Sequence, residues 1–179
     1  MGLLAAIMLA VYLANPFGTG SLAPRARLLG VALYKIPSRS MEPTLQQGDF
    51  ILANAARYAF AAPPVGDLVV FRFPPQRSIA YVKRIAGIPG DRVRIEGGRL
   101  YVNDHQVTEP YLAQQALRQP DSLRMAERTV PAGHYFMLGD NRDNSNDSRY
   151  WGYVPRADLV GRVFVVWYAE DTRRIGSVR

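Results

Sequence analysis

The sequence has no cysteine and few side chains that act as bases near neutral pH. The absence of Cys excludes a disulfide scaffold, a Cys nucleophile and any thiolate metal site. His105 and His134 are the only histidines, so a three-His zinc site is excluded and a Ser-His-Asp triad would have to use one of them. Lysine is equally scarce, because Lys35 and Lys83 are the only two among 22 basic residues. A buried Lys can become a neutral amine whereas Arg stays protonated, so these two lysines are the main candidates for a base other than His or a carboxylate.

The formal net charge of +7 over 179 residues does not by itself indicate a partner. The arginines are scattered singly or in pairs, and no run exceeds Arg173–Arg174. The sequence has no zinc finger, homeodomain-like segment or aromatic-glycine RNA-binding signature. We therefore expect a solvated basic surface on one compact domain, with a small additional lobe, and no nucleic-acid partner.

The first 24 residues carry no charged side chain, and 3–14 are almost wholly apolar. A membrane-spanning helix needs about 20 apolar residues, so this run is short. It could be a membrane anchor, a cleaved signal peptide or a buried core helix. A signal peptide normally has basic residues before the apolar run, and a helix at a protein surface would be striped. The pattern favours a short anchor over 1–24. One observation opposes a simple topology: Arg25 and Arg27 follow the apolar run and nothing basic precedes it, so the positive-inside tendency would hold these arginines in the cytoplasm.

From Leu28 onward the pattern is that of short β-strands. Three segments are rich in β-branched and aromatic residues and are bounded by Gly, Pro or Asp: 49–53, 67–73 and 162–168. The Gly97-Gly98 pair predicts a tight hairpin turn, and Asn103-Asp104 predicts another. Because strands follow at short intervals without βαβ alternation, we expect a mainly β fold of coiled, barrel-like antiparallel sheets.

The segment 104–131 is less patterned than the rest and mixes charged with polar residues. Within it, Tyr111–Gln119 has a weak helical pattern. We therefore expect a small inserted lobe over 104–131, between two parts of a β core at 28–103 and 132–179.

Two serines lie in the proline-stiffened segment 36–45. Residues two apart face the same side of an extended chain, so Ser38 and Ser40 could point into one site. The alternative is an ordinary polar turn, and by itself the serine pair favours that alternative.

Lys83 lies in an apolar, strand-like stretch, 78–91, that ends in a tight turn. Partial burial there would disfavour the ammonium form and bring its pKa toward a useful range for a base. Alternatively, the stem packs and the ammonium reaches water. His105 and His134 lie in no comparable motif.

The segment 139–149 is dense in Asp, Asn, Ser and Arg. It does not have the EF-hand pattern, since counting from Asp140 puts Arg142 and Ser145 where a ligand and a glycine are needed. The alternative to a cation loop is a rigid turn built by side chains that bond their own backbone.

Taken together and in order, these segments resemble bacterial signal peptidase I, the membrane-bound leader peptidase with a Ser-Lys dyad. The matching stretches are 37–45, 66–71, 81–91 and 139–152. The resemblance extends over most of the chain from Lys35 onward, and four motifs in order are very specific.

The resemblance implies that Ser40 is the nucleophile and Lys83, as a neutral amine, the general base. It implies that Ser38 completes the oxyanion hole with the Ser40 backbone N–H, and that Ser145 orients the lysine. Four matching positions are expected to brace the site by ion pairing: Asp140, Asp147, Arg149 and Arg84. Six others are expected to wall the pockets for small residues at −1 and −3: Ile36, Pro37, Met41, Leu45, Tyr81 and Val82.

The resemblance further implies a serine endopeptidase of signal-peptidase fold that removes signal peptides from exported preproteins. We expect it to work at the outer, periplasmic face of the bacterial cytoplasmic (inner) membrane, in contact with membrane lipid and without a metal or organic cofactor. Many Gram-negative relatives carry two N-terminal spans, whereas this chain has one short apolar run. The alternatives are a Ser-Lys peptidase specialised for one secretion or conjugation system, and a non-catalytic basic β module that binds nucleic acid or anionic lipid.

Overall fold

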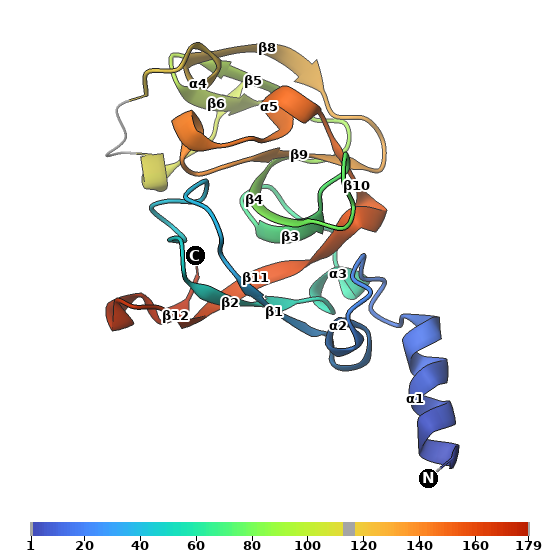
Figure 1. Ribbon diagram of the computed structural model, residues 1–179. Helices are drawn as coiled ribbons and strands as arrows, with labels where there is room; N and C mark the ends of the chain where they lie inside the picture. Colours follow the sequence, from blue (N-terminus) through green and yellow to red (C-terminus); the bar gives the residue numbers. More distant parts are fainter. Residues whose placement is uncertain (1, 113–116, 179) are drawn as a thin grey trace.

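The computed structural model describes residues 2–112 and 117–178, and most of its regular structure is β (Figure 1). The strands are β1 Val31–Lys35, β2 Phe50–Asn54, β3 Leu68–Arg72, β4 Ala80–Gly87, β5 Arg92–Glu96, β6 Arg99–Val102, β7 His105–Gln106, β8 Arg124–Thr129, β9 His134–Leu138, β10 Val154–Pro155, β11 Leu159–Tyr168 and β12 Gly176–Ser177. The α-helices are α1 Gly2–Ala14, α2 Pro24–Leu29, α3 Arg57–Phe60, α4 Pro120–Leu123 and α5 Ser148–Trp151.

A large antiparallel sheet runs in the order β1-β2-β11-β3-β4-β9-β10, with β12 paired to β11. The register of β11 shifts against both neighbours, and such bulges increase local twist and bend a strand. The sheet is curled, and fully buried side chains such as Ile51, Val70 and Leu45 pack into a core against it. The prediction of a mainly β fold of coiled antiparallel sheets is confirmed.

A second, four-stranded sheet has the order β7-β6-β5-β8 and lies beside β9 (Figure 1). The two sheets share a core in which Phe136 and Leu138 of β9 pack with Val93 and Ile95 of β5. Both predicted turns are present, since Gly97 and Gly98, like Asn103 and Asp104, have positive φ.

This second sheet draws on residues from both sides of the boundary predicted at 104. It begins at Arg92, because the β5–β6 hairpin supplies its centre and β8 joins β5 from the far side. The segment 104–131 therefore contributes edge strands rather than the whole lobe. The weak helix predicted over Tyr111–Gln119 falls partly on 113–116, outside the described residues; Pro110–Leu112 before it forms a short 3-10 turn.

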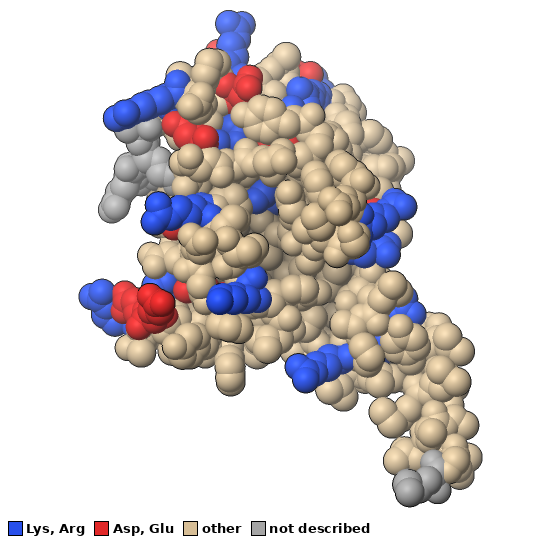
Figure 2. All heavy atoms as spheres, in the orientation of Figure 1, with Lys and Arg blue, Asp and Glu red and all other residues tan. Residues whose placement is uncertain are grey.

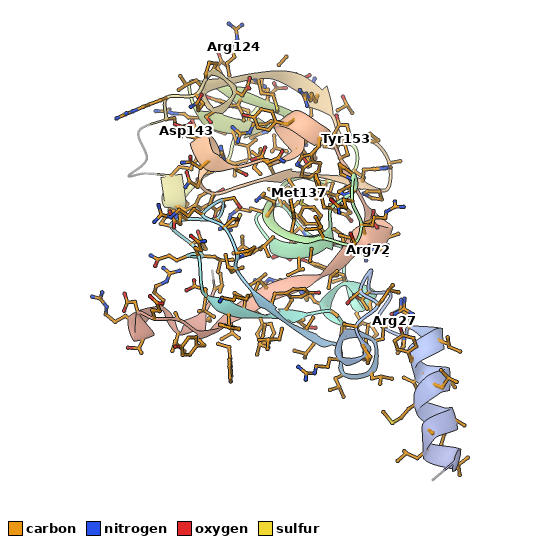
Figure 3. All side chains as sticks on the ribbon, in the orientation of Figure 1. Arg27, Arg72, Arg124, Met137, Asp143 and Tyr153 are labelled. Carbon is orange, nitrogen blue, oxygen red and sulfur yellow. The ribbon has the colours of Figure 1, made fainter. Side chains whose placement is uncertain are left out.

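The N-terminal apolar run forms α1, a helix of 13 residues that projects from the body with its apolar side chains exposed (Figure 1). It ends before Asn15, which takes a positive φ of 46°. The anchoring segment predicted over 1–24 is therefore helical only as far as Ala14, and a separate helix, α2, starts at Pro24. Arg27 of α2 (labelled in Figure 3) contacts α1, since its guanidinium carbon lies 4.9 Å from the centre of the Tyr12 ring. Throughout residues 2–112 and 117–178, no helix combines the length and the apolarity needed to cross a membrane.

Basic side chains are spread singly or in small groups over the face shown in Figure 2, with acidic side chains beside several of them. This distribution agrees with the solvated basic surface expected from the sequence.

Candidate active site

The turn after β1 brings Ser38 and Ser40 together. Residue Ile36 is buried in the core and anchors the end of the strand, after which the chain leaves the sheet. The two hydroxyl oxygens lie 3.3 Å apart, as expected for serines that point into one site.

Strand β4 places Lys83 against Ser40 from 43 positions away in the sequence. The Lys83 Nζ donates to Ser40 Oγ at 2.5 Å, and the lysine is only 3% exposed. Burial lowers the pKa of Lys83 to about 8. The carboxylates of Asp147 and Asp140 raise this pKa, whereas the charge of Arg149 lowers it. A hydroxyl hydrogen-bonded to a buried amine of depressed pKa is the arrangement that activates a serine nucleophile.

The two histidines take no part in this arrangement. The His105 and His134 Nδ1 atoms lie 2.8 and 2.9 Å from the backbone carbonyl oxygens of Asn103 and Ala132, each two residues away. Neither side chain lines the cavity described below, so a Ser-His-Asp triad is excluded at this site.

The loop 139–152 contributes two buried ion pairs. The Arg84 guanidinium donates two hydrogen bonds to the Asp140 carboxylate, Nε to Oδ1 at 2.9 Å and Nη2 to Oδ2 at 2.6 Å. The Arg149 guanidinium donates to Asp147 in the same bidentate manner, at 2.8 and 2.9 Å. All four residues are less than a tenth exposed, and paired geometry of this kind offsets the cost of burying charge. The structure therefore brings together the four residues predicted to brace the site.

Other contacts fix the same loop. The Asp147 carboxylate also accepts from the Gly139 N–H at 3.0 Å and caps α5 by accepting from the Arg149 N–H. A Cβ at Gly139 would collide with Ser145 Oγ and would lie 2.6 Å from the Ser40 carbonyl oxygen, so only glycine fits between them. Ser145 consequently packs beside the nucleophile turn.

Ser145 does not make the contact expected of it. Its Oγ is buried and has no hydrogen-bond partner within the part of the chain that the structure describes. Its predicted role in orienting Lys83 stays a prediction.

Three supporting contacts were not predicted from the sequence. Thr44 Oγ1 donates to Asp140 Oδ2 at 2.5 Å. Arg142 forms a buried ion pair with Glu109 and donates from Nε to the Gly139 carbonyl at 3.1 Å. Thr44 and Arg142 stand inside the matching motifs. Glu109 lies in the weakly patterned segment 104–131, where nothing in the sequence indicated a role at the site.

A cavity of about 370 Å³ adjoins the Ser40–Lys83 pair. Its lining residues are Tyr34, Lys35, Ile36, Pro37, Ser38, Ser40, Met41, Ile79, Ala80, Tyr81, Val82, Lys83, Asn144 and Asn146. Five of the six predicted wall residues are among them. The exception is Leu45, for which the prediction is wrong. Its side chain is fully buried in the core and does not line the cavity.

We expect Asp147→Ala to lower the free energy of unfolding by about 3–5 kcal/mol, because it leaves the Arg149 guanidinium buried without its carboxylate. Urea denaturation measures the effect. Asp171→Ala is the matched control, since it removes an equivalent pair with Arg173 on the surface, where the loss should be much smaller. Equal losses in the two variants would contradict this account of the loop.

Residues 3–168 match the family model described as signal peptidase, peptidase S26. Signal peptidase I of Pseudomonas aeruginosa is 42% identical over 180 residues, covering 75% of this chain and 63% of that protein. Probable signal peptidase I-2 of Synechocystis is 43% identical over 137 residues, covering 73% of this chain and 60% of that protein. The chain thus spans slightly less than two thirds of the length of these relatives.

The fold is also similar to a solved structure. A signal peptidase I from Enterococcus faecalis superposes with a TM-score of 0.52 and 32% sequence identity, over 57% of this chain and 97% of that one.

Proposed function

Because the chain belongs to the signal peptidase family, peptidase S26, we propose that it is a serine endopeptidase that removes N-terminal signal peptides from exported preproteins. The observation that carries the proposal is the buried contact of 2.5 Å between Lys83 Nζ and Ser40 Oγ beside a substrate-sized cavity.

The dyad accounts for both halves of the reaction. The neutral Lys83 amine takes the Ser40 hydroxyl proton while Oγ attacks the carbonyl carbon of the residue at −1. The resulting oxyanion accepts from the Ser38 hydroxyl and the Ser40 backbone N–H, and one such donor typically contributes ~10²–10³ in rate. The lysine then gives its proton to the leaving amine as the peptide bond breaks. In the second half it deprotonates a water that hydrolyses the acyl ester and returns the proton to Ser40.

Strand β4 provides a seat for an extended substrate. It pairs with β3 along Ala80–Arg84 but with β9 only from Arg84 to Gly87. The other edge of 80–83 therefore faces the cavity, where a peptide backbone can add as a further strand. Apolar walls such as Ile36 and Val82 then leave room for small side chains at −1 and −3 and exclude large ones by overlap.

In this proposal the enzyme works at the outer, periplasmic face of the cytoplasmic membrane. The α1 side chains that support lipid contact are strongly exposed, with Leu3 77% and Leu13 67% accessible. A further apolar groove lies where α2 meets the large sheet, and its lining includes Leu29, Leu33 and Trp167. Apolar surface of this extent is typical of membrane or protein contact.

The direct test is cleavage of a purified preprotein with an Ala-X-Ala site, read by N-terminal sequencing of the product. We expect one cut after the second Ala. A protein that leaves this site intact in detergent and in vesicles would contradict the proposal.

The pH dependence of the same reaction tests the base. Only the neutral amine accepts the serine proton, so kcat/KM should rise with pH through about 8, the depressed pKa of Lys83. Below that pH the protonated amine cannot act, and the rate should fall about tenfold per pH unit. A profile that is flat between pH 6 and about 9 would rule out Lys83 as the base.

A further inference from the structure

Both lysines of the chain line the same cavity. Lys83 is the buried partner of Ser40, whereas Lys35 is the exposed last residue of β1, with its Nζ 5.7 Å from the centre of the Phe50 ring. The catalytic dyad gives Lys35 no role, and none of the sequence motifs assigns it one.

The charged side chains among the described residues that line the cavity are all basic. Besides the two lysines, the lining residues are apolar side chains, tyrosines, serines and asparagines, and none of those described is Asp, Glu or Arg. The reaction requires Lys83 to be neutral, which leaves the Lys35 ammonium as the only cation among these described lining residues during attack. The nearby Arg39 and Glu42 pair with each other at 3.5 Å, so their charges offset one another.

Distance along the chain gives the position at which a substrate would meet this cation. Lys35 precedes Ser40 by five residues, and the chain turns at 38–40 after β1 ends, so the two residues lie at most about 16 Å apart, the length of five extended residues at ~3.3 Å each. A peptide that lies extended along the 80–83 edge with its −1 carbonyl at Ser40 first fills the pockets at −1 and −3, so within this reach its residues at −4 to −6 are the ones that meet the ammonium.

We infer that Lys35 is a specificity-determining residue, which favours acidic and disfavours basic side chains at −4 to −6 of the substrate. The inference rests on the proposed function. It adds a charge preference to the selection of small residues at −1 and −3, and it acts through Coulomb attraction at the rim of the cavity rather than through the dyad.

The test uses peptides that carry an Ala-X-Ala site and differ only in Asp or Arg at −5. For the unmodified protein we expect kcat/KM to be about three- to fivefold higher for the Asp peptide, the range of a solvent-exposed ion pair. Lys35→Met should bring the ratio to about one and Lys35→Glu should invert it, while Lys35→Arg should keep it. Raising the salt concentration should reduce the ratio.

Two controls separate this effect from general ones. Arg124→Gln removes an exposed cation of β8 in the second sheet (Figure 3) and should leave the Asp/Arg ratio unchanged. A peptide pair with the same exchange at +3 should give one ratio for all variants.

Two outcomes would overturn the inference while leaving cleavage intact. One is an Asp/Arg ratio at −5 that is the same for Lys35→Glu as for the unmodified protein. The other is a change in the ratio at +3 instead of −5. Failure of the unmodified protein to cut any peptide would overturn the proposed function and this inference together.

Discussion

Replacing Ser40 by alanine is expected to lower kcat/KM for an Ala-X-Ala preprotein by at least about 10⁴-fold. The substitution removes the Oγ that attacks the substrate and leaves Lys83 with no hydroxyl to activate. Residual turnover would come only from substrate binding and the remaining oxyanion donors. Cleavage is measured by gel shift and N-terminal sequencing over several hours.

The fold should survive this change, because alanine fits within the space of the serine. The loss is the two hydrogen bonds of the Ser40 hydroxyl, to Lys83 and to Ser38, about 1–3 kcal/mol of stability, which circular dichroism and urea denaturation can check. Ser177→Ala, at an exposed position of β12, is the matched control and should retain full activity. Processing by Ser40→Ala within about tenfold of the unmodified rate would refute the assignment of the nucleophile.

Lys83→Met should cause a loss of similar size, since the buried methionine fills the volume of the lysine stem but cannot accept a proton. Because Ser40 and Lys83 act as one unit, the double variant should be no slower than either single variant. Lys83→Arg should also be inactive, since arginine does not give up its proton at this pH. Activity in any of these three would show that another group is the base.

The Lys83→Met variant also tests how burial of Lys83 affects the stability of the protein. Burial lowers the pKa of Lys83 from 10.5 to about 8 in the folded state, so between these values the unfolded chain binds more protons. The free energy of unfolding should therefore rise with pH across this window, by about 3 kcal/mol relative to Lys83→Met. Urea denaturation of both proteins at pH values below and above this window measures the difference. Parallel pH dependences in the two proteins would mean that Lys83 is not desolvated.

The features that depend on local sequence were predictable, in the fold as well as in the site. In the fold, the Gly97-Gly98 hairpin follows from backbone conformations that glycine adopts easily. In the site, Ser40 and Lys83 stand in recognisable segments. Their contact across 43 positions came from resemblance alone, since spacing in the sequence does not show which strands become neighbours.

The remaining features depend on tertiary packing. Leu45 lies in a recognisable motif, but the turn after Ser40 directs its side chain into the core instead of the cavity. Glu109 gains its importance only where the chain brings it to Arg142. The second sheet starts at Arg92 because β8 returns to pair with β5, a long-range contact that local patterning cannot reveal.

The placement of both lysines on one cavity makes the site chemically addressable. Within this sequence no other side chain carries a primary amine. An acylating or reductively methylating reagent would thus leave its side-chain marks only around the nucleophile, quickly at the exposed Lys35 and slowly at the 3% exposed Lys83. Peptide mass mapping of those two marks would then footprint occupancy of the cavity directly, without a substrate turnover assay.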